Sequence, residues 1–140
     1  MRFTGRTAVL ALGGVVVAGS VGAARARTTS SPVGGVAGSY TYHTYCASCH
    51  GARGKGDGPL AENLRSRPPD LTQLARENDG KYPAEMVRQV IDGRKPIAGH
   101  GGPDMPVWGD AFNNADTAHD EKAVEQKIQS LVDYLKTIQE

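Results

Sequence analysis

The sequence predicts an all-α protein of one domain, and three observations support this class. Apolar residues recur at helical spacing near the C-terminus, at Val124, Ile128, Leu131, Leu135 and Ile138. No segment alternates apolar and polar residues in the manner of a half-buried strand. A length of 140 residues leaves room for one domain and little more.

The first 26 residues have the pattern of an export signal. Arg2 and Arg6 give a positive start, residues 8–19 are uncharged and largely apolar, and a small-x-small sequence ends at Ala26. We therefore predict a cleaved signal peptide over residues 1–26. The alternative is an uncleaved membrane anchor, since the uncharged stretch is just long enough to span a bilayer.

The folded domain is predicted to cover residues 38–140. The segment before it, residues 27–37, is rich in Ser, Thr, Gly and Pro and is expected to be a flexible linker. A first helix is expected over residues 38–49, where aromatic and cysteine side chains recur at helical spacing. Residues 51–59 contain four glycines and are expected to form a loop.

Three further helices are expected towards the C-terminus. A short one is placed at residues 71–76. The next opens at Pro83, which suits a first helical position, and stops at Gly93. The last runs over residues 120–138. The Gly- and Pro-rich residues 93–110 are expected to form a long loop, and loops of this length commonly carry a function.

The only two cysteines lie in the run Cys46-Ala47-Ser48-Cys49-His50. Because positions i and i+3 of a helix share one face, both thiols can bond to the vinyl groups of one porphyrin. The histidine that follows can then place an imidazole nitrogen on the iron. The C-x-x-C-H pattern is typical of c-type haem attachment, so one covalent haem c, held by two thioether bonds, is the predicted cofactor.

Two other interpretations of the cysteine pair fit less well. A thioredoxin-like redox pair would lie beside a βαβ pattern, which is missing. A zinc site needs four ligands, and only His43, His100 and His119 remain as imidazoles outside the motif. The composition agrees with a cofactor at the centre of the fold, since aromatic residues make up only 6% of the chain. A formal net charge of +1 gives no global basic surface for nucleic acid.

The spacing from Gly38 through Tyr42 to His50 resembles the G-x-x-x-aromatic-x-x-x-C-x-x-C-H first helix of class I cytochromes c, particularly the small bacterial periplasmic members. The resemblance covers about residues 38–138. It implies about four helices wrapped around one covalently attached haem. It also implies that the first and last helices cross, with Tyr134 on the last helix facing the glycine and tyrosine of the first.

The resemblance implies that a methionine binds the iron opposite His50. The run Met-Pro-Val-Trp-Gly that starts at Met105 looks like the distal motif of the family. Of the other methionines, Met1 leaves with the signal and Met86 lies on the apolar face of a predicted helix, where a core role is favoured. His100 is the competing ligand, and a second imidazole would lower the reduction potential relative to methionine.

Three further residues are candidates for contact with the cofactor. The resemblance implies that the carbonyl of Pro59 accepts a hydrogen bond from the second nitrogen of His50, although this proline could simply end a glycine loop. Trp108 can pack on the haem edge or direct its indole N–H to a propionate. Arg94 can pair with a propionate, or it can be solvated.

The function that these features imply is one-electron transfer, without enzymatic activity. The expected location is the periplasm, with a dehydrogenase or the cytochrome bc1 complex as donor and an oxidase, peroxidase or reductase as acceptor. One alternative is a haem subunit docked on a periplasmic dehydrogenase. Another is a haem sensor or peroxidase with a labile distal ligand. Membrane contact is expected only if the N-terminal segment is uncleaved, which would anchor the chain facing the periplasm.

Overall fold

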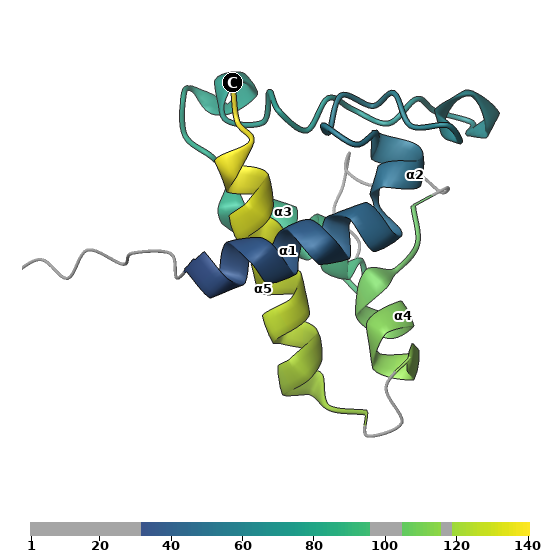
Figure 1. Cartoon of the computed structure of the whole chain (residues 1–140), viewed down its shortest axis with the longest axis vertical. Coiled ribbons are helices and arrows are strands. Elements are labelled where there is room, and N and C mark those ends of the chain that lie inside the picture. The colour runs from purple at the N-terminus through teal and green to yellow at the C-terminus, as the bar shows by residue number, and fades with distance from the viewer. Residues whose placement is uncertain (1–31, 96–104, 116–118) are drawn as a thin grey trace, which may run out of the picture.

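The computed structural model describes residues 32–95, 105–115 and 119–140, and these ranges contain helices and no strands. The chain order is α1 (Pro32–Tyr45), α2 (Ala47–His50), two short 3-10 turns (Ala61–Asn63 and Arg76–Asn78), α3 (Ala84–Asp92), α4 (Trp108–Ala115) and α5 (Glu121–Thr137) (Figure 1). The predicted all-α class is confirmed. Within the described ranges, no helix has the length and apolar character needed to cross a membrane.

The first and last helices cross at close range, with α1 lying across α5 (Figure 1). Gly38 makes this approach possible, because a Cβ atom there would lie 2.0 Å from the backbone oxygen of Ser130. One turn later Tyr42, only 1% exposed, packs against Tyr134 with ring centroids 5.2 Å apart. Its hydroxyl donates a 2.7 Å hydrogen bond to the carbonyl of Gly51. The predicted helix crossing is therefore confirmed.

Replacing Gly38 with alanine is expected to lower the free energy of unfolding by about 2 kcal/mol or more, in the upper part of the range for overpacking. The new methyl group would meet backbone atoms of α5, which no rotamer change can move, so the two helices must separate. Gly35→Ala is the matched control, since a Cβ there meets nothing within 4 Å. Denaturant unfolding of the purified protein measures both, and an equal change in the two variants would contradict the close-approach explanation.

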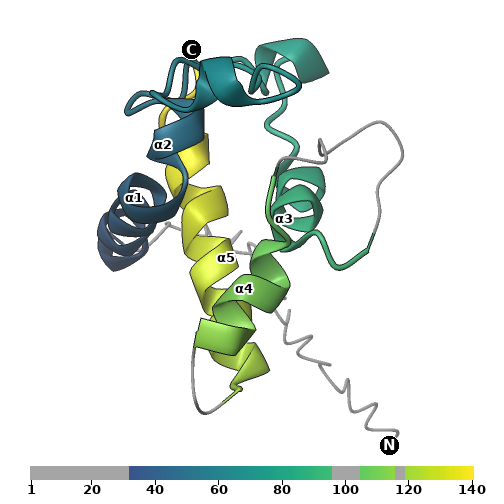
Figure 2. The same cartoon turned by 90° about the vertical axis from the view of Figure 1, so that its right-hand side faces the viewer.

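Helix α5 lies between α1 and α3 and carries most of the apolar core (Figure 2). It begins where expected, because the side chain of Asp120 accepts a 2.9 Å hydrogen bond from the backbone N–H of Lys122 and so caps the helix. Val124, Ile128, Leu131 and Leu135 of the predicted apolar stripe are buried, and Ile138, just past the last turn, is half-buried. Helix α3 likewise begins after Pro83 and ends at Gly93, whose φ of 70° is left-handed. Both helices confirm the predictions.

The N-terminal part of the fold differs from the prediction in two ways. Helix α1 starts at Pro32, inside the expected linker, and ends at Tyr45. Cys46 lies at the junction between α1 and α2 rather than inside one continuous helix, and its φ and ψ are −111° and −34°. The backbone N–H of His50 still donates to the carbonyl of Cys46 at 2.9 Å, so the two cysteines remain one turn apart despite the break.

Helix α4 was not expected, because residues 93–110 are predicted as a loop. Its sequence, WGDAFNNA, contains a glycine, an aspartate and two asparagines, which are poor helix formers. Tertiary packing outweighs this low propensity. Phe112 is 2% exposed and stacks on Trp108 at a centroid distance of 5.2 Å. The helix expected over residues 71–76 does not form, and only the 3-10 turn Arg76–Asn78 begins at its last residue.

The segment between α2 and α3 crosses the end of the molecule near the C-terminus (Figures 1 and 2). Lys55 donates a 2.9 Å hydrogen bond to the hydroxyl of Thr72 and pairs with the carboxylate of Glu140. Gln139 adds a 2.8 Å bond from its amide to the carbonyl of Leu71. Gln139 and Glu140 therefore hold the segment between α2 and α3 against the C-terminal end of α5.

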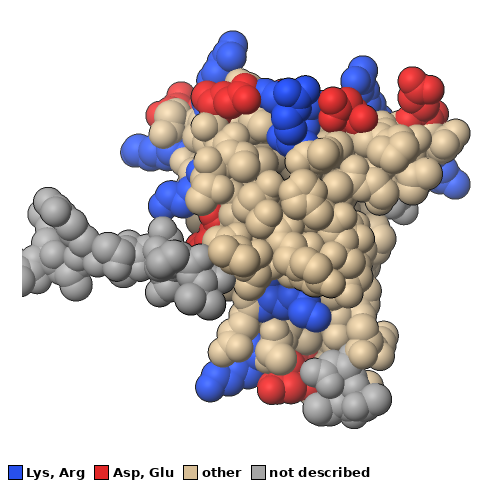
Figure 3. Space-filling view, in the orientation of Figure 1, with Lys and Arg blue, Asp and Glu red and all other residues tan. Residues whose placement is uncertain are grey.

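Charged side chains are unevenly distributed over the surface. In Figure 3 they gather mainly near the two ends of the molecule, whereas the face over α1 is largely uncharged. Helix α1 contains no Lys, Arg, Asp or Glu, and its Val36 and Tyr40 are each 74% exposed. Helix α1 itself therefore adds no Lys, Arg, Asp or Glu side chain to this face.

Candidate functional site

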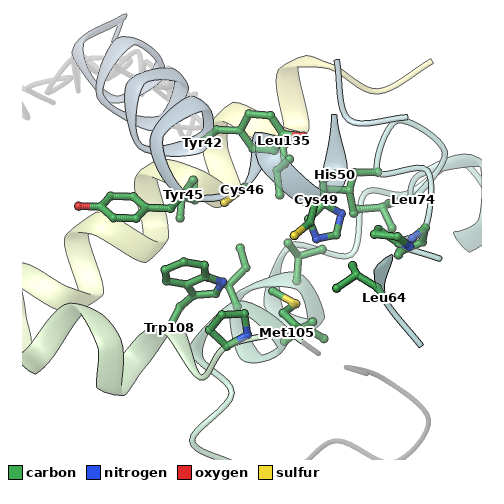
Figure 4. A pocket seen from close by; sticks show the side chains of 18 of the residues that line it. Tyr42, Tyr45, Cys46, Cys49, His50, Leu64, Leu74, Met105, Trp108 and Leu135 are labelled. Atoms are coloured by element: carbon green, nitrogen blue, oxygen red, sulfur yellow. The ribbon is translucent and has the colours of Figure 1, made fainter. Parts of the chain in front are cut away.

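A cavity of about 240 Å³ opens between the end of α1, the segment after α2, and helices α3 and α5. Its walls are mainly apolar and aromatic and include Tyr45, Leu64, Leu74, Val90, Trp108 and Leu135 (Figure 4). Protein interiors are close-packed, and voids much larger than a water molecule are rare. A cavity of this size and polarity is suited to a large apolar group.

Cys46, Cys49 and His50 form one wall of this cavity, as the C-x-x-C-H pattern predicts. Both cysteines are partly buried, and they form no disulfide with each other. Burial, with a smaller contribution from Cys49, raises the pKa of the Cys46 thiol to about 12. A thiol of this kind is protonated at neutral pH, unlike the exposed, acidic cysteines of redox pairs. The described residues also contain no cluster of three or more His, Cys, Asp or Glu side chains that could hold zinc.

The surroundings of His50 favour the neutral imidazole, which is the form that binds a metal ion. Burial lowers its pKa, and an interaction with the backbone of Pro69 acts in the opposite direction. Its Nδ1 is buried and has no hydrogen-bond partner of normal geometry among the described residues. A neutral imidazole facing a void, next to two thiols, fits covalent haem with a histidine on the iron.

The proline beside this histidine differs from the predicted one. Both prolines are exposed, but Pro69 lines the cavity and influences the His50 ring, whereas Pro59 lies outside the cavity wall. The structure therefore brings Pro69 close to the His50 ring and shows no such contact for Pro59. Residues 51–60 fold back onto α2, where the backbone N–H of Gly58 donates to the carbonyl of Cys49 at 3.2 Å, and the chain joins the cavity wall only at residues 64–74.

Met105 and Trp108 lie on the far side of the cavity from Cys46 (Figure 4). Trp108 packs edge-on against Tyr45, with ring centroids 5.6 Å apart, which holds the start of α4 against the end of α1. Met86, predicted for the apolar core, is half-buried and also lines the cavity. The competing ligand, His100, lies outside the described residues.

Arg94 does not reach the cavity, which is a second difference from the predicted site. It forms ion pairs with Asp92 and Glu121 at 2.6 and 2.8 Å. Among the described residues, the Lys or Arg side chain on the cavity wall is that of Arg67, whose Nε donates a 3.3 Å hydrogen bond to the carbonyl of Gly56. Arg67 is exposed at the cavity rim, where a guanidinium can pair with an anionic group of a bound ligand. Nothing in the local sequence distinguishes it from other loop arginines.

Comparison with known proteins gives one kind of match. Residues 35–135 match the family model described as cytochrome c oxidase, cbb3-type, subunit III. Searches of curated proteins and of solved structures found no significant match. The matched range runs from α1 to the last turns of α5 and so includes every described residue of the cavity wall.

Proposed function

Since this chain belongs to the cytochrome c oxidase, cbb3-type, subunit III family of c-type cytochrome domains, we propose that it carries one electron at a time on a single haem c bound by His50 and Met105. A cytochrome c domain implies covalent haem and haem-based electron transfer with redox partners, rather than turnover of a substrate. The Cys46–Cys49 pair is the C-x-x-C arrangement that this chemistry requires.

The observation that carries the proposal is the arrangement of donors around one apolar cavity. Cys46, Cys49 and His50 occupy one wall, and Met105 lies across from them (Figure 4). The bound haem supplies a one-electron change of its iron. His50 and Met105 would hold its iron through a neutral imidazole and a neutral thioether, which would leave no open position for substrate, and a methionine ligand raises the reduction potential. The apolar wall limits access of water to the site.

The partners and the location are proposed on separate grounds. The signal peptide predicted over residues 1–26 supports export to the periplasm. There a dehydrogenase or the bc1 complex would donate electrons, and the family name favours a terminal oxidase among the acceptors. A peroxidase or reductase would serve equally well as acceptor on chemical grounds. A labile distal ligand, as in a sensor or peroxidase, would require Met105 to leave the iron readily.

The purified full-length protein, produced in a host that attaches haem c, is expected to carry one covalent haem. The oxidised form should show the weak far-red absorbance of a methionine–ferric bond, and the reduced form should not bind carbon monoxide. A redox titration should follow a one-electron curve. Intact mass gives the number of haems and also shows whether cleavage follows Ala26. Carbon monoxide binding by the untreated protein would favour the sensor or peroxidase alternative.

A further inference from the structure

Three charged side chains meet at the base of the segment that carries Met105. The guanidinium of Arg94 donates to both carboxylate oxygens of Asp92, at 2.6 and 3.2 Å. Its Nη1 donates to both oxygens of Glu121, at 3.0 and 2.8 Å. Asp92 ends α3 and Glu121 begins α5, so this Arg94 cluster (Asp92, Arg94 and Glu121) joins two helices.

The cluster also touches the first turn of α4, just after Met105. A Cβ atom at Gly109 would lie 2.2 Å from the carboxylate of Asp92 and 2.4 Å from Nε of Arg94. Any larger residue at this position would collide with the ion pair, so the backbone of α4 rests directly on it. Gly109 is buried and only four residues from Met105.

The two ends of the same segment are in contact with each other. At its start, Gly93 adopts a left-handed conformation, and a Cβ atom there would lie 3.2 Å from Cα of Val107. Val107 is two residues after Met105 and opens directly into α4. The chain therefore leaves α3 and returns to α4 at one point, and the Arg94 cluster lies at that point.

We propose that the Arg94 cluster is a positioning device for Met105, which holds both ends of residues 93–108 against α5 and so determines how firmly the thioether stays on the iron. This inference rests on the proposed His50 and Met105 ligation. In this proposal Arg94 acts on Met105 by holding the backbone on either side of it. The sequence had predicted a direct contact between Arg94 and a haem propionate.

The interactions in the cluster are stronger than those of an ordinary surface pair. The side chains of Asp92 and Arg94 are only 21% and 29% exposed. Arg94 donates hydrogen bonds to both carboxylate oxygens of Asp92 and to both of Glu121. Hydrogen bonding to Arg94 lowers the pKa of Asp92, and hydrogen bonding to Asp92 raises the pKa of Arg94. Glu121 lies in the first turn of α5, where a negative charge is favourable.

The cluster is not needed to hold α3 on α5. Val87 and Ile91 of α3 are buried in the shared apolar core. In addition, the hydroxyl of Tyr82 donates a 3.0 Å hydrogen bond to the carbonyl of Val132 in α5. Removal of the ion pairs should therefore loosen the segment around Met105 while the global fold persists.

The test compares Arg94→Gln with Arg88→Gln in the haem-loaded full-length protein. Arg88 forms a similar ion pair with Glu85 at 2.6 Å within α3, and its charge acts on Asp92 from a distance, so it controls for loss of a positive charge near the cluster without loss of the cluster's hydrogen bonds. Loss of several charge-assisted hydrogen bonds should raise the affinity of ferric iron for imidazole, which competes with Met105, by about tenfold in Arg94→Gln. As the pH is raised, the far-red absorbance of Arg94→Gln should also be lost at a lower pH than that of the wild type. Arg88→Gln should behave like the wild type.

Glu121→Gln provides a second variant if Arg94→Gln does not fold, because Glu121 is 56% exposed and its loss leaves the Asp92 pair intact. Its expected effect has the same direction and is smaller. Wild-type imidazole affinity and far-red absorbance in a folded Arg94→Gln protein, or in Glu121→Gln if the former fails to fold, would overturn the positioning role alone. Absence of the far-red absorbance from the wild-type protein would overturn the proposed ligation, and the positioning role with it.

Discussion

Met105→Ala is expected to abolish the far-red absorbance completely, to lower the reduction potential and to let the reduced protein bind carbon monoxide. A thioether is a soft, neutral ligand that favours ferrous over ferric iron, so its loss stabilises the oxidised form. It also leaves one axial position of the iron open. Absorbance spectra of the oxidised and carbon monoxide-treated forms, with a redox titration, measure all three effects.

Two control variants separate this ligand assignment from packing. Met86 also lines the cavity, but it is only half-buried, so Met86→Ala should cost less than the roughly 2–5 kcal/mol of a fully buried methionine and leave the far-red absorbance intact. His100→Ala should leave the spectrum unchanged. If His100→Ala loses the sixth ligand and Met105→Ala does not, the methionine assignment is wrong while the haem assignment stands.

Cys46→Ala and Cys49→Ala are each expected to reduce covalent haem sharply and to destabilise the fold. The reason is that the haem fills a cavity of about 240 Å³. Without the haem, the apolar walls of this cavity would face water, and a small domain has only about 5–15 kcal/mol of stability to lose. Haem staining of a denaturing gel and thermal unfolding measure the two effects.

Ser48→Ala is the control for the cysteine variants, because Ser48 lies between them and is exposed. It should keep covalent haem and unfold at the wild-type temperature. Cys46 also packs against the apolar core, so Cys46→Ala is expected to be the less stable of the two cysteine variants. Undiminished covalent haem in both single variants would contradict the attachment site.

The sequence alone was sufficient for the parts of the fold that depend on local signals. The stripe of α5, the start of that helix near residue 120 and the glycine stop of α3 each depend on residues close together in the chain, and all are confirmed. The crossing of α1 and α5 was also predicted, because Gly38 and Tyr42 have a spacing shared with a known family. The joint placement of Cys46 and His50 on one wall follows from their separation by one helical turn.

Tertiary structure decided which loop residues come to lie at the cavity and which do not. Sequence spacing assigned Pro59 to the histidine, but Lys55 and the C-terminal residues hold the segment after α2 so that Pro69 reaches the cavity instead. Arg94 was assigned to the cofactor, and its partner Glu121 lies 27 residues away in the chain. Helix α4 forms despite poor propensity because Phe112 is buried. Contacts between residues distant in the chain are set by packing of the whole domain, and short-range patterns contain no record of them.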